Sequence, residues 1–301
     1  MHTQPKPFRI VAPTFTPFSD SGAINLSVIP AYADYLRSKG ISDVFINGTT
    51  GEGASLSVAE QGELISAWMA AAGQDIAVIV HVGHASIAEA SGLARRAQDE
   101  GAAAIAALPP YYFRPNSIAR LVATMAEVAA GAPALPFYYY HIPSMTGVMQ
   151  PMWKFQALAA EAIANFAGIK FTFEDLSDYR LCLAGAEGRE IFFGRDEMLL
   201  GALATGARSA VGSTYNIFPH IYQKMIAAWD AGDIDTARES QLDASRLVAA
   251  AVETGAALPA LKAMLGFAGP DCGPCRNPLG TLGTADIATL HQALAQANAS
   301  R

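Results

Sequence analysis

The chain has 301 residues, of which 51% are hydrophobic and 16% charged, and its net charge is −7. This composition supports a large core, and the absence of a basic cluster excludes a nucleic-acid-binding protein, which needs concentrated positive charge. No apolar run reaches the roughly 18 residues that would span a membrane. The first seven residues, MHTQPKP, contain no apolar segment after a basic one, so we expect no secretory signal. Three cysteines favour a reducing compartment. We therefore expect a cytoplasmic α/β protein, and an enzyme.

Short apolar segments alternate with longer Ala-rich amphipathic segments over most of the chain. The predicted strands are 10–14, 44–47, 77–82, 103–108, 137–140, 166–173, 190–194 and 209–213. The predicted helices among and after them are 29–39, 59–71, 87–100, 117–130, 151–164, 178–186, 196–205 and 219–231. Apolar strands that are each followed by a helix are typical of a parallel sheet covered by helices. Eight such units fit a closed (β/α)8 TIM barrel.

From residue 219 onward the pattern is purely helical, and after the helix at 219–231 further helices are predicted at 233–254, 259–267 and 285–297. We interpret residues 1–231 as the barrel and 232–301 as a C-terminal helical extension packed on it. The main alternative is an open, doubly wound sheet that binds a dinucleotide. The only glycine-rich loop, GTTGEG at 48–53, has the wrong spacing for that ligand and follows the second strand rather than the first. The sequence therefore favours the barrel.

In a barrel of this kind, active residues lie at the carboxyl ends of the strands and in the loops that follow. This rule selects polar residues at every strand end. They are Thr14, Thr16, residues 47–52, His81, residues 109–112, Tyr140, His141, Lys170, Thr172, residues 194–197 and residues 213–216.

Lys170 is one of only six lysines, and it lies inside an apolar run, FAGIKFTF. A buried ammonium must be paired, must lose its proton or must face a cavity, unless its stem only carries the charge out to water. A neutral amine attacks a ketone to form a Schiff base, and a phenol such as Tyr140 can move the proton of a substrate hydroxyl. The turn Thr49-Thr50-Gly51 offers hydroxyl and N–H groups that can hold a carboxylate. The residues therefore indicate imine chemistry on an α-keto acid.

Four motifs resemble one family. They are GTTGEG at 48–53, FYYYHIPSMTG at 137–147, GIKFT at 168–172 and VGSTYN at 211–216. In this order and spacing they resemble the N-acetylneuraminate lyase and dihydrodipicolinate synthase family of lysine-dependent aldolases, and the resemblance covers nearly the whole chain. It implies a (β/α)8 barrel with a helical tail, usually assembled as a homotetramer. It also implies covalent Schiff-base catalysis without a metal or organic cofactor.

Carried over by motif, the resemblance makes Lys170 the Schiff-base lysine and Tyr140 the proton-transferring residue. Thr49 and Thr50 would bind the carboxylate of the pyruvoyl group. Tyr112, in PPYYF, matches an aromatic position near the site and the tight dimer contact.

Two segments of the chain distinguish the lyases from the synthases within this family. The dihydrodipicolinate synthases have an arginine for a second carboxylate where this chain has Met145. The lyases resemble this chain at Gly194-Arg195-Asp196-Glu197, where carboxylate and backbone oxygens would accept hydrogen bonds from a polyhydroxyl tail. Two further positions that contact the sugar match Thr172 and Ser213. The resemblance therefore lies closest to the N-acetylneuraminate lyases.

The same residues also fit other interpretations. Arg195 could instead recognise a sugar acid, as in a keto-deoxy sugar acid aldolase or dehydratase of the same family. The chain could also be a non-catalytic keto-acid-binding protein. Cys272-Gly-Pro-Cys275 has redox spacing, but it falls between helices rather than in a βαβ unit, so we expect a structural loop. His81 and His84 have no carboxylate cluster beside them, so we expect no metal site.

Overall fold

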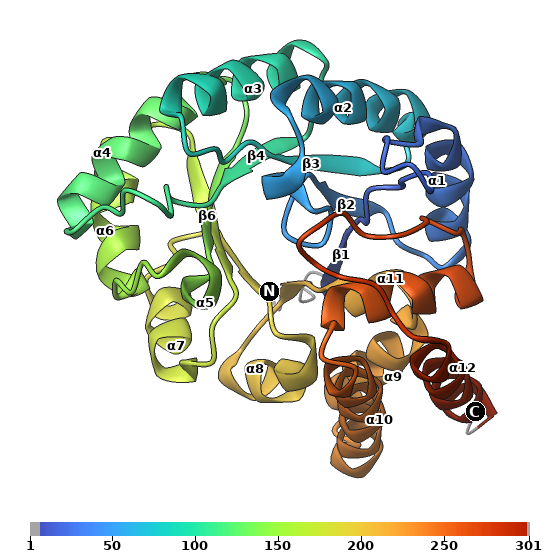
Figure 1. Ribbon diagram of the computed structural model, residues 1–301. Coiled ribbons are helices and arrows are strands. Elements are labelled where there is room, and N and C mark those ends of the chain that lie inside the picture. Colours follow the sequence, from blue (N-terminus) through green and yellow to red (C-terminus); the bar gives the residue numbers. More distant parts are fainter. Residues whose placement is uncertain (1–6, 300–301) are drawn as a thin grey trace.

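The computed structural model, which describes residues 7–299, is a closed barrel of eight parallel strands ringed by helices (Figure 1). Each strand pairs with the next in chain order, and β8 pairs with β1 to close the barrel. Residues 1–6 and 300–301 are not described, so most of the MHTQPKP segment and the outer limits of the two predicted units lie outside the described residues. The predicted (β/α)8 barrel is confirmed.

The strands lie close to their predicted positions. They are β1 (Arg9–Pro13), β2 (Asp43–Ile46), β3 (Ala77–His81), β4 (Ala104–Ala107), β5 (Phe137–His141), β6 (Phe166–Phe171), β7 (Glu190–Phe193) and β8 (Ser209–Val211). Two of them end two residues earlier than predicted, since β6 stops before Thr172, and β8 gives way to a 3-10 helix at Ser213–Asn216. Thr172 and Ser213 therefore lie in the loops at the carboxyl end of the barrel.

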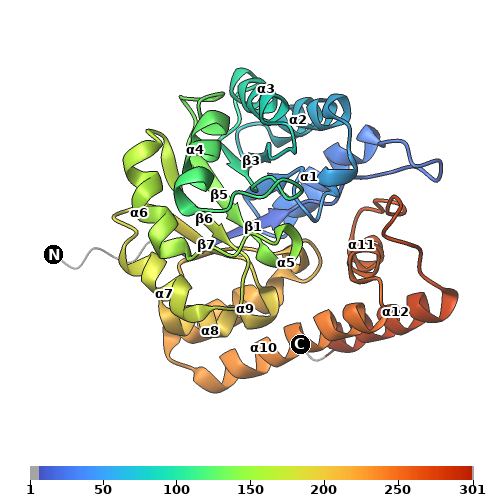
Figure 2. The same ribbon diagram turned by 60° about the vertical axis from the view of Figure 1, so that its left-hand side comes forward.

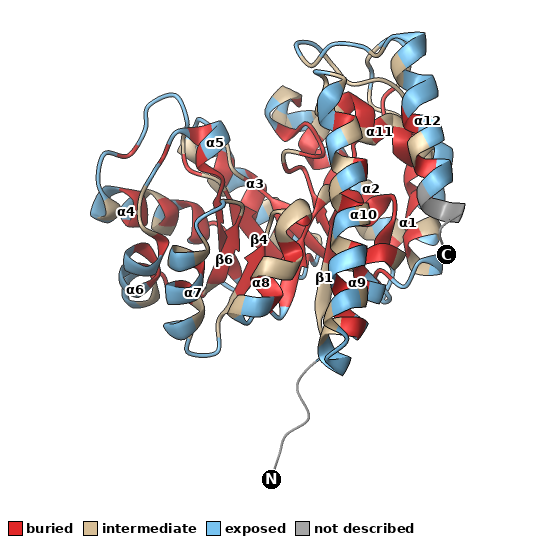
Figure 3. Cartoon of the chain, turned by 90° about the horizontal axis from the view of Figure 1, so that it is seen from below, coloured by how far each residue is buried: buried red, intermediate tan, exposed pale blue. Residues whose placement is uncertain are grey.

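Helices cover the outside of the strands, and their buried faces and the strands form the core (Figure 3). They are α1 (Ile29–Ser38), α2 (Val58–Ala72), α3 (Ile87–Asp99), α4 (Ile118–Ala129), α6 (Met152–Ala162), α7 (Leu176–Ala184), α8 (Leu199–Thr205) and α9 (Pro219–Ala231). Ser57, Ser86 and Ser117 each cap a helix by accepting a backbone N–H bond, which explains why these helices begin where they do. One short helix, α5 (Pro143–Thr146), was not predicted, because a single turn carries no periodicity.

Alternation along β5 sorts three consecutive tyrosines between the two sides of the barrel wall. Tyr138 and Tyr140 belong to the inner cluster with Phe45 and Phe192. Tyr139 faces outward, where its ring lies 4.4 Å from that of Phe155. Successive residues of a strand point to opposite faces, so only Tyr140 of the three reaches the open end from inside.

The C-terminal segment is helical, as predicted, with α10 (Ile234–Glu253), α11 (Ala257–Ala268) and α12 (Thr284–Ala299). Helices α10 and α12 run alongside each other at one side of the barrel (Figure 2). Small and apolar residues bury one stripe of α10, among them Ala237, Ala244 and Leu247. Among the described residues no helix combines the length and hydropathy needed to cross a membrane.

Candidate active site

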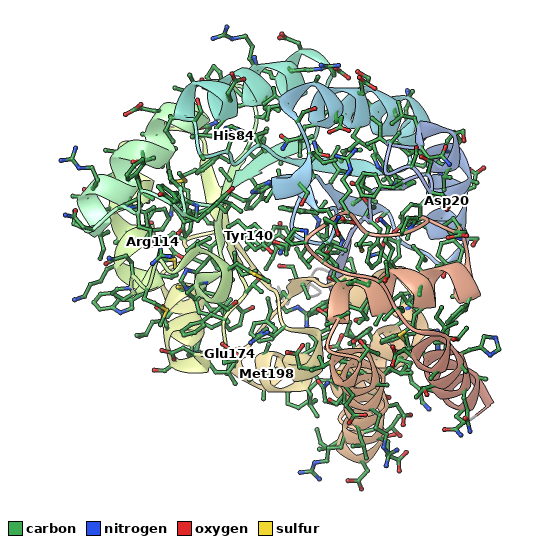
Figure 4. All side chains as sticks on the ribbon, in the orientation of Figure 1. Asp20, His84, Arg114, Tyr140, Glu174 and Met198 are labelled. Atoms are coloured by element: carbon green, nitrogen blue, oxygen red, sulfur yellow. The ribbon has the colours of Figure 1, made fainter. Side chains whose placement is uncertain are left out.

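Lys170 and Tyr140 face each other across neighbouring strands. They are register partners of β6 and β5. Lys170 is only 5% exposed, and its Nζ lies 3.6 Å from the centroid of the Tyr140 ring and 5.2 Å from that of Phe45. Nζ also lies 3.5 Å from Thr172 Oγ1. The amine therefore stays inside the barrel end and does not carry its charge out to water. Tyr140 is seen near the centre of the ring of strands (Figure 4).

The GTTGEG loop brings its hydroxyls to the same place. Thr49 Oγ1 lies 3.2 Å from the Tyr140 hydroxyl, and Thr50 Oγ1 lies 2.6 Å from Ser213 Oγ. On the other side of the loop, Thr16 Oγ1 donates to the Gly51 carbonyl at 2.6 Å. Predicted residues from four strand ends, those of β1, β2, β5 and β8, thus meet, around hydroxyl groups rather than charges.

Gly194 is required by its contact with Thr172. A Cβ at position 194 would lie 2.0 Å from Thr172 Oγ1, far inside any allowed contact. The absence of a side chain therefore lets the end of β7 approach the hydroxyl beside Lys170. This explains in physical terms why a glycine opens the GRDE segment.

Asp196 is buried and firmly held. Its Oδ2 accepts hydrogen bonds from Thr214 N at 2.9 Å and from Thr214 Oγ1 at 2.5 Å, and Thr214 Oγ1 lies 2.7 Å from the Tyr222 hydroxyl. Burial raises the pKa of Asp196 to about 6, although the two bonds from Thr214 act in the opposite direction. One oxygen of the predicted tail acceptor is thus occupied by the protein itself. No local sequence pattern predicts this contact, because Thr214 lies 18 residues away, after β8.

Arg195 lies between two carboxylates at the rim. One guanidinium nitrogen pairs with Glu174, and another lies 3.5 Å from Glu197 Oε1. Glu174, labelled at the rim in Figure 4, is the third residue after β6. Glu174 was not among the predicted site residues, although it lies only two residues beyond Thr172, in the loop at the carboxyl end of β6.

His81 lies behind Tyr140 and joins two loops. The two rings are 5.8 Å apart in an edge-to-face arrangement. Leu108 N donates to Nε2 at 3.2 Å, so Nδ1 carries the proton and donates to the Asn47 carbonyl at 3.0 Å. Burial lowers the pKa of His81 to about 4, and the imidazole is neutral at pH 7. Within residues 7–299 no cluster of three metal-ligating side chains occurs.

Tyr112 is the one predicted site residue that the structure does not bring to the others. Its side chain is exposed, as is that of Phe113, and the two rings contact each other at 5.0 Å. The CGPC motif lies after α11, outside any βαβ unit, and burial raises the pKa of both Cys272 and Cys275 to about 12. A reactive thiol needs the opposite shift, so the thiol oxidoreductase reading has no support.

The sequence matches the model of the dihydrodipicolinate synthetase family over residues 6–297. The chain belongs to this family. It is 42% identical to the N-acetylneuraminate lyase of Xenopus tropicalis over 273 residues, which cover 90% of both chains. The N-acetylneuraminate lyase of Proteus mirabilis superposes with a TM-score of 0.93 at 34% identity, covering 98% of this chain and 99% of that one. A sialic acid aldolase from Ruminococcus gnavus with its catalytic lysine mutated superposes with a TM-score of 0.91 at 25% identity, covering 100% of this chain and 99% of that one.

The family match extends through α10, α11 and most of α12, so the extension belongs to the family fold as much as the barrel does. Within the family, both named lyases align over nine-tenths or more of their own length. The similarity to the lyases therefore extends over most of the chain.

Proposed function

We propose that this member of the dihydrodipicolinate synthetase family is a Schiff-base aldolase that cleaves N-acetylneuraminate to N-acetylmannosamine and pyruvate, reversibly. The observation that carries the proposal is the buried Lys170 Nζ 3.6 Å from the Tyr140 ring, with the Tyr140 hydroxyl 3.2 Å from Thr49 Oγ1. The relatives named N-acetylneuraminate lyase support the substrate, and the Ruminococcus aldolase supports a lysine mechanism, since that protein has a catalytic lysine.

In the proposed reaction, Lys170 Nζ attacks the keto carbon of the open-chain sugar, and water leaves to give a protonated imine. Hydroxyl and N–H groups of Thr49, Thr50 and Gly51 hold the carboxylate. Tyr140 takes the proton of the C4 hydroxyl as the C3–C4 bond breaks, and the bonding electrons move into the imine. N-acetylmannosamine leaves as the aldehyde. The remaining enamine gains a proton at C3, and water hydrolyses the imine to release pyruvate and free Lys170.

This sequence of steps uses only groups of the chain and the substrate, so it requires neither a metal ion nor an organic cofactor. The protonated imine is the electron sink that a cofactor supplies in other enzymes. Thr49 couples the carboxylate-binding loop to Tyr140 through their hydroxyl contact, so substrate binding and proton transfer share one hydrogen-bonded group.

The sugar tail would lie along the rim formed by Gly194, Asp196, Glu197, Thr172 and Ser213. Arg195 does not offer a free cation there, because Glu174 and Glu197 both compensate its charge. Carboxylate oxygens accept hydrogen bonds from hydroxyl groups but repel an anion. The rim therefore favours a polyhydroxyl tail over a second carboxylate, and this weighs against a sugar diacid.

The assembly we propose is a homotetramer in the cytoplasm. Tyr112 and Phe113 are 79% and 85% exposed on one loop of the isolated chain. Large aromatic side chains in such a pair are typical of contact surfaces. Sedimentation of the purified protein would give the mass of four chains, and a monomer mass would contradict this part of the proposal.

The substrate is tested by comparing three reactions at equal enzyme concentration by kcat/KM. They are pyruvate release from N-acetylneuraminate, pyruvate release from a 2-keto-3-deoxy hexonate, and pyruvate consumption in the presence of aspartate semialdehyde. The proposal predicts that N-acetylneuraminate exceeds the other substrates by at least about tenfold. A preference for the hexonate would assign the chain to the keto-deoxy sugar acid enzymes instead.

A further inference from the structure

A fully buried ion pair lies on the far side of the carboxylate-binding loop. Lys262 Nζ, on α11, donates to Glu52 Oε1 at 2.9 Å, and the two side chains are 1% and 0% exposed. Among the described residues no other ion pair is buried to this extent. Buried pairs contribute little net stability, because the lost hydration of both charges offsets their attraction. Stability alone is therefore a poor account of this pair.

The pair is part of a network that ties the end of the extension to the loop after β2. The other oxygen of Glu52 accepts from Arg276 N at 2.8 Å, and Lys262 also donates to the Pro274 carbonyl at 2.8 Å. The Arg276 guanidinium pairs with Glu60 at 2.5 Å. These segments are more than 200 residues apart in the chain.

Glu60 extends the network into helix α2. Its carboxylate accepts from Ser57 N at 2.9 Å, and Ser57 Oγ accepts from Glu60 N at 3.2 Å, which forms the capping box of that helix. Arg276 donates in addition to the Ser55 carbonyl at 3.0 Å. The loop between β2 and α2 is thus fixed at both its turn and its helical end by residues of the extension.

Glu52 also closes the turn that presents the two threonines. Its N–H donates to the Thr49 carbonyl at 3.0 Å, and Gly53 N donates to the Gly48 carbonyl at 3.0 Å. The backbone of Glu52 has φ 55°, in the left-handed region that a side chain normally disfavours. A residue with a Cβ stays in that conformation only when its surroundings hold it, and here the surroundings are Lys262 and Arg276 N.

We propose that Lys262 is a positioning residue for the keto-acid site: acting through Glu52, it holds the 48–53 turn in the shape that presents Thr49 and Thr50 to the substrate carboxylate. This inference rests on the proposed function. Lys262 itself touches Glu52, the Pro274 carbonyl and the face of the Phe18 ring, at 4.3 Å, and it takes no part in the chemistry.

The test separates carboxylate binding from imine formation. Borohydride trapping on Lys170 is measured with pyruvate and with hydroxyacetone, a ketone without a carboxylate, in the parent chain and in Lys262→Met. The half-saturating pyruvate concentration should rise by at least about tenfold, whereas trapping of hydroxyacetone should stay within about twofold. Glu52→Gln keeps an acceptor for Arg276 N but loses the ion pair, so it should also raise the half-saturating pyruvate concentration. This variant replaces Lys262→Met in the test if Lys262→Met does not fold.

Leu290→Ala on α12 is the matched control, because Leu290 is fully buried in the extension and no ion pair or side-chain hydrogen bond places it in the network. It should lower the melting temperature and leave the half-saturating pyruvate concentration unchanged. If Lys262→Met leaves that concentration within about twofold of the parent value, or weakens trapping of both ketones equally, the positioning role is overturned. If the parent chain traps neither ketone on Lys170, the proposed function fails, and this inference fails with it.

Discussion

The hydroxyl group of Tyr140 is the proposed proton carrier and contacts Thr49. The aromatic ring of the same residue contacts Lys170 Nζ. Tyr140→Phe removes only the hydroxyl. We expect kcat for N-acetylneuraminate cleavage to fall by about 10²–10⁴-fold, because general acid–base transfer contributes that much. Pyruvate should still be trapped on Lys170, since imine formation does not break the C3–C4 bond. The measurement is steady-state pyruvate release, with borohydride trapping in parallel.

Tyr139 supplies the matched control for that substitution. It is the neighbouring residue of the same strand, it faces outward, and its buried hydroxyl has no hydrogen-bond partner. Tyr139→Phe should leave kcat unchanged and should not destabilise the fold, because it removes an unsatisfied polar group. An equal loss of activity in both variants would contradict the role given to Tyr140.

Asp196 gives a pH prediction at a single residue. Burial raises its pKa from the usual 3.8 to about 6, so between these values the folded chain binds a proton that the unfolded chain releases. Its stabilising contribution is full below pH 3.8 and is lost as the pH rises through about 6. The free energy of unfolding of Asp196→Asn, relative to that of the parent, should therefore rise by about 1–3 kcal/mol as the pH goes from 4 to 7. Urea unfolding at both pH values measures this, and an unchanged difference would contradict it.

Strand β6 approaches β7 closely at Gly168, so the stability of this pair of strands should depend on that glycine. Gly168 has φ +144°, and a Cβ there would lie 1.8 Å from the Glu190 carbonyl of β7. Gly168→Ala should force β6 away from β7 and lower the free energy of unfolding by about 3 kcal/mol or more. It should also displace Lys170, which lies two residues beyond Gly168 on the same strand. Thermal unfolding and kcat would both report the change.

Gly92→Ala is its control within helix α3. Nothing lies within 4 Å of a Cβ at that exposed helical position. Alanine is the better helix former there, so the variant should be more stable by about 0.5–1 kcal/mol. If both Gly168→Ala and Gly92→Ala stabilised the chain, the close approach of β6 and β7 at Gly168 would be contradicted.

Elements were more predictable from the sequence than contacts were. Short apolar segments between Ala-rich amphipathic ones located all eight strands, and the alternation of side chains along a strand is sufficient to place Tyr139 and Tyr140 on opposite sides of β5. The direction of the Asp196 carboxylate could not be predicted, because Thr214 of another strand end fixes it. The pair of Glu52 and Lys262 has a separation of 210 residues, and no local pattern connects them. The predicted division of the chain after residue 231 stays a prediction.

Two buried histidines lower the folding stability of the whole chain in acid. Burial lowers the pKa of His81 and of His141 from the usual 6.5 to about 4. The unfolded chain therefore takes up protons first, and stability that is present above pH 6.5 is lost as the pH falls towards 4. Each histidine contributes up to about 3 kcal/mol to this loss. Melting temperatures from pH 7 to pH 4.5 should decline, and a rise would contradict the burial of both imidazoles.

Covalent catalysis by Lys170 is tested by borohydride trapping of the imine. Pyruvate and N-acetylneuraminate are each incubated with the chain and borohydride, and the adduct is located by peptide mass, with Lys170→Ala as control. We expect one adduct, on Lys170, from both ligands, with N-acetylmannosamine released from the second and no adduct in the variant. An adduct at another lysine, or none in the parent chain, would contradict the mechanism.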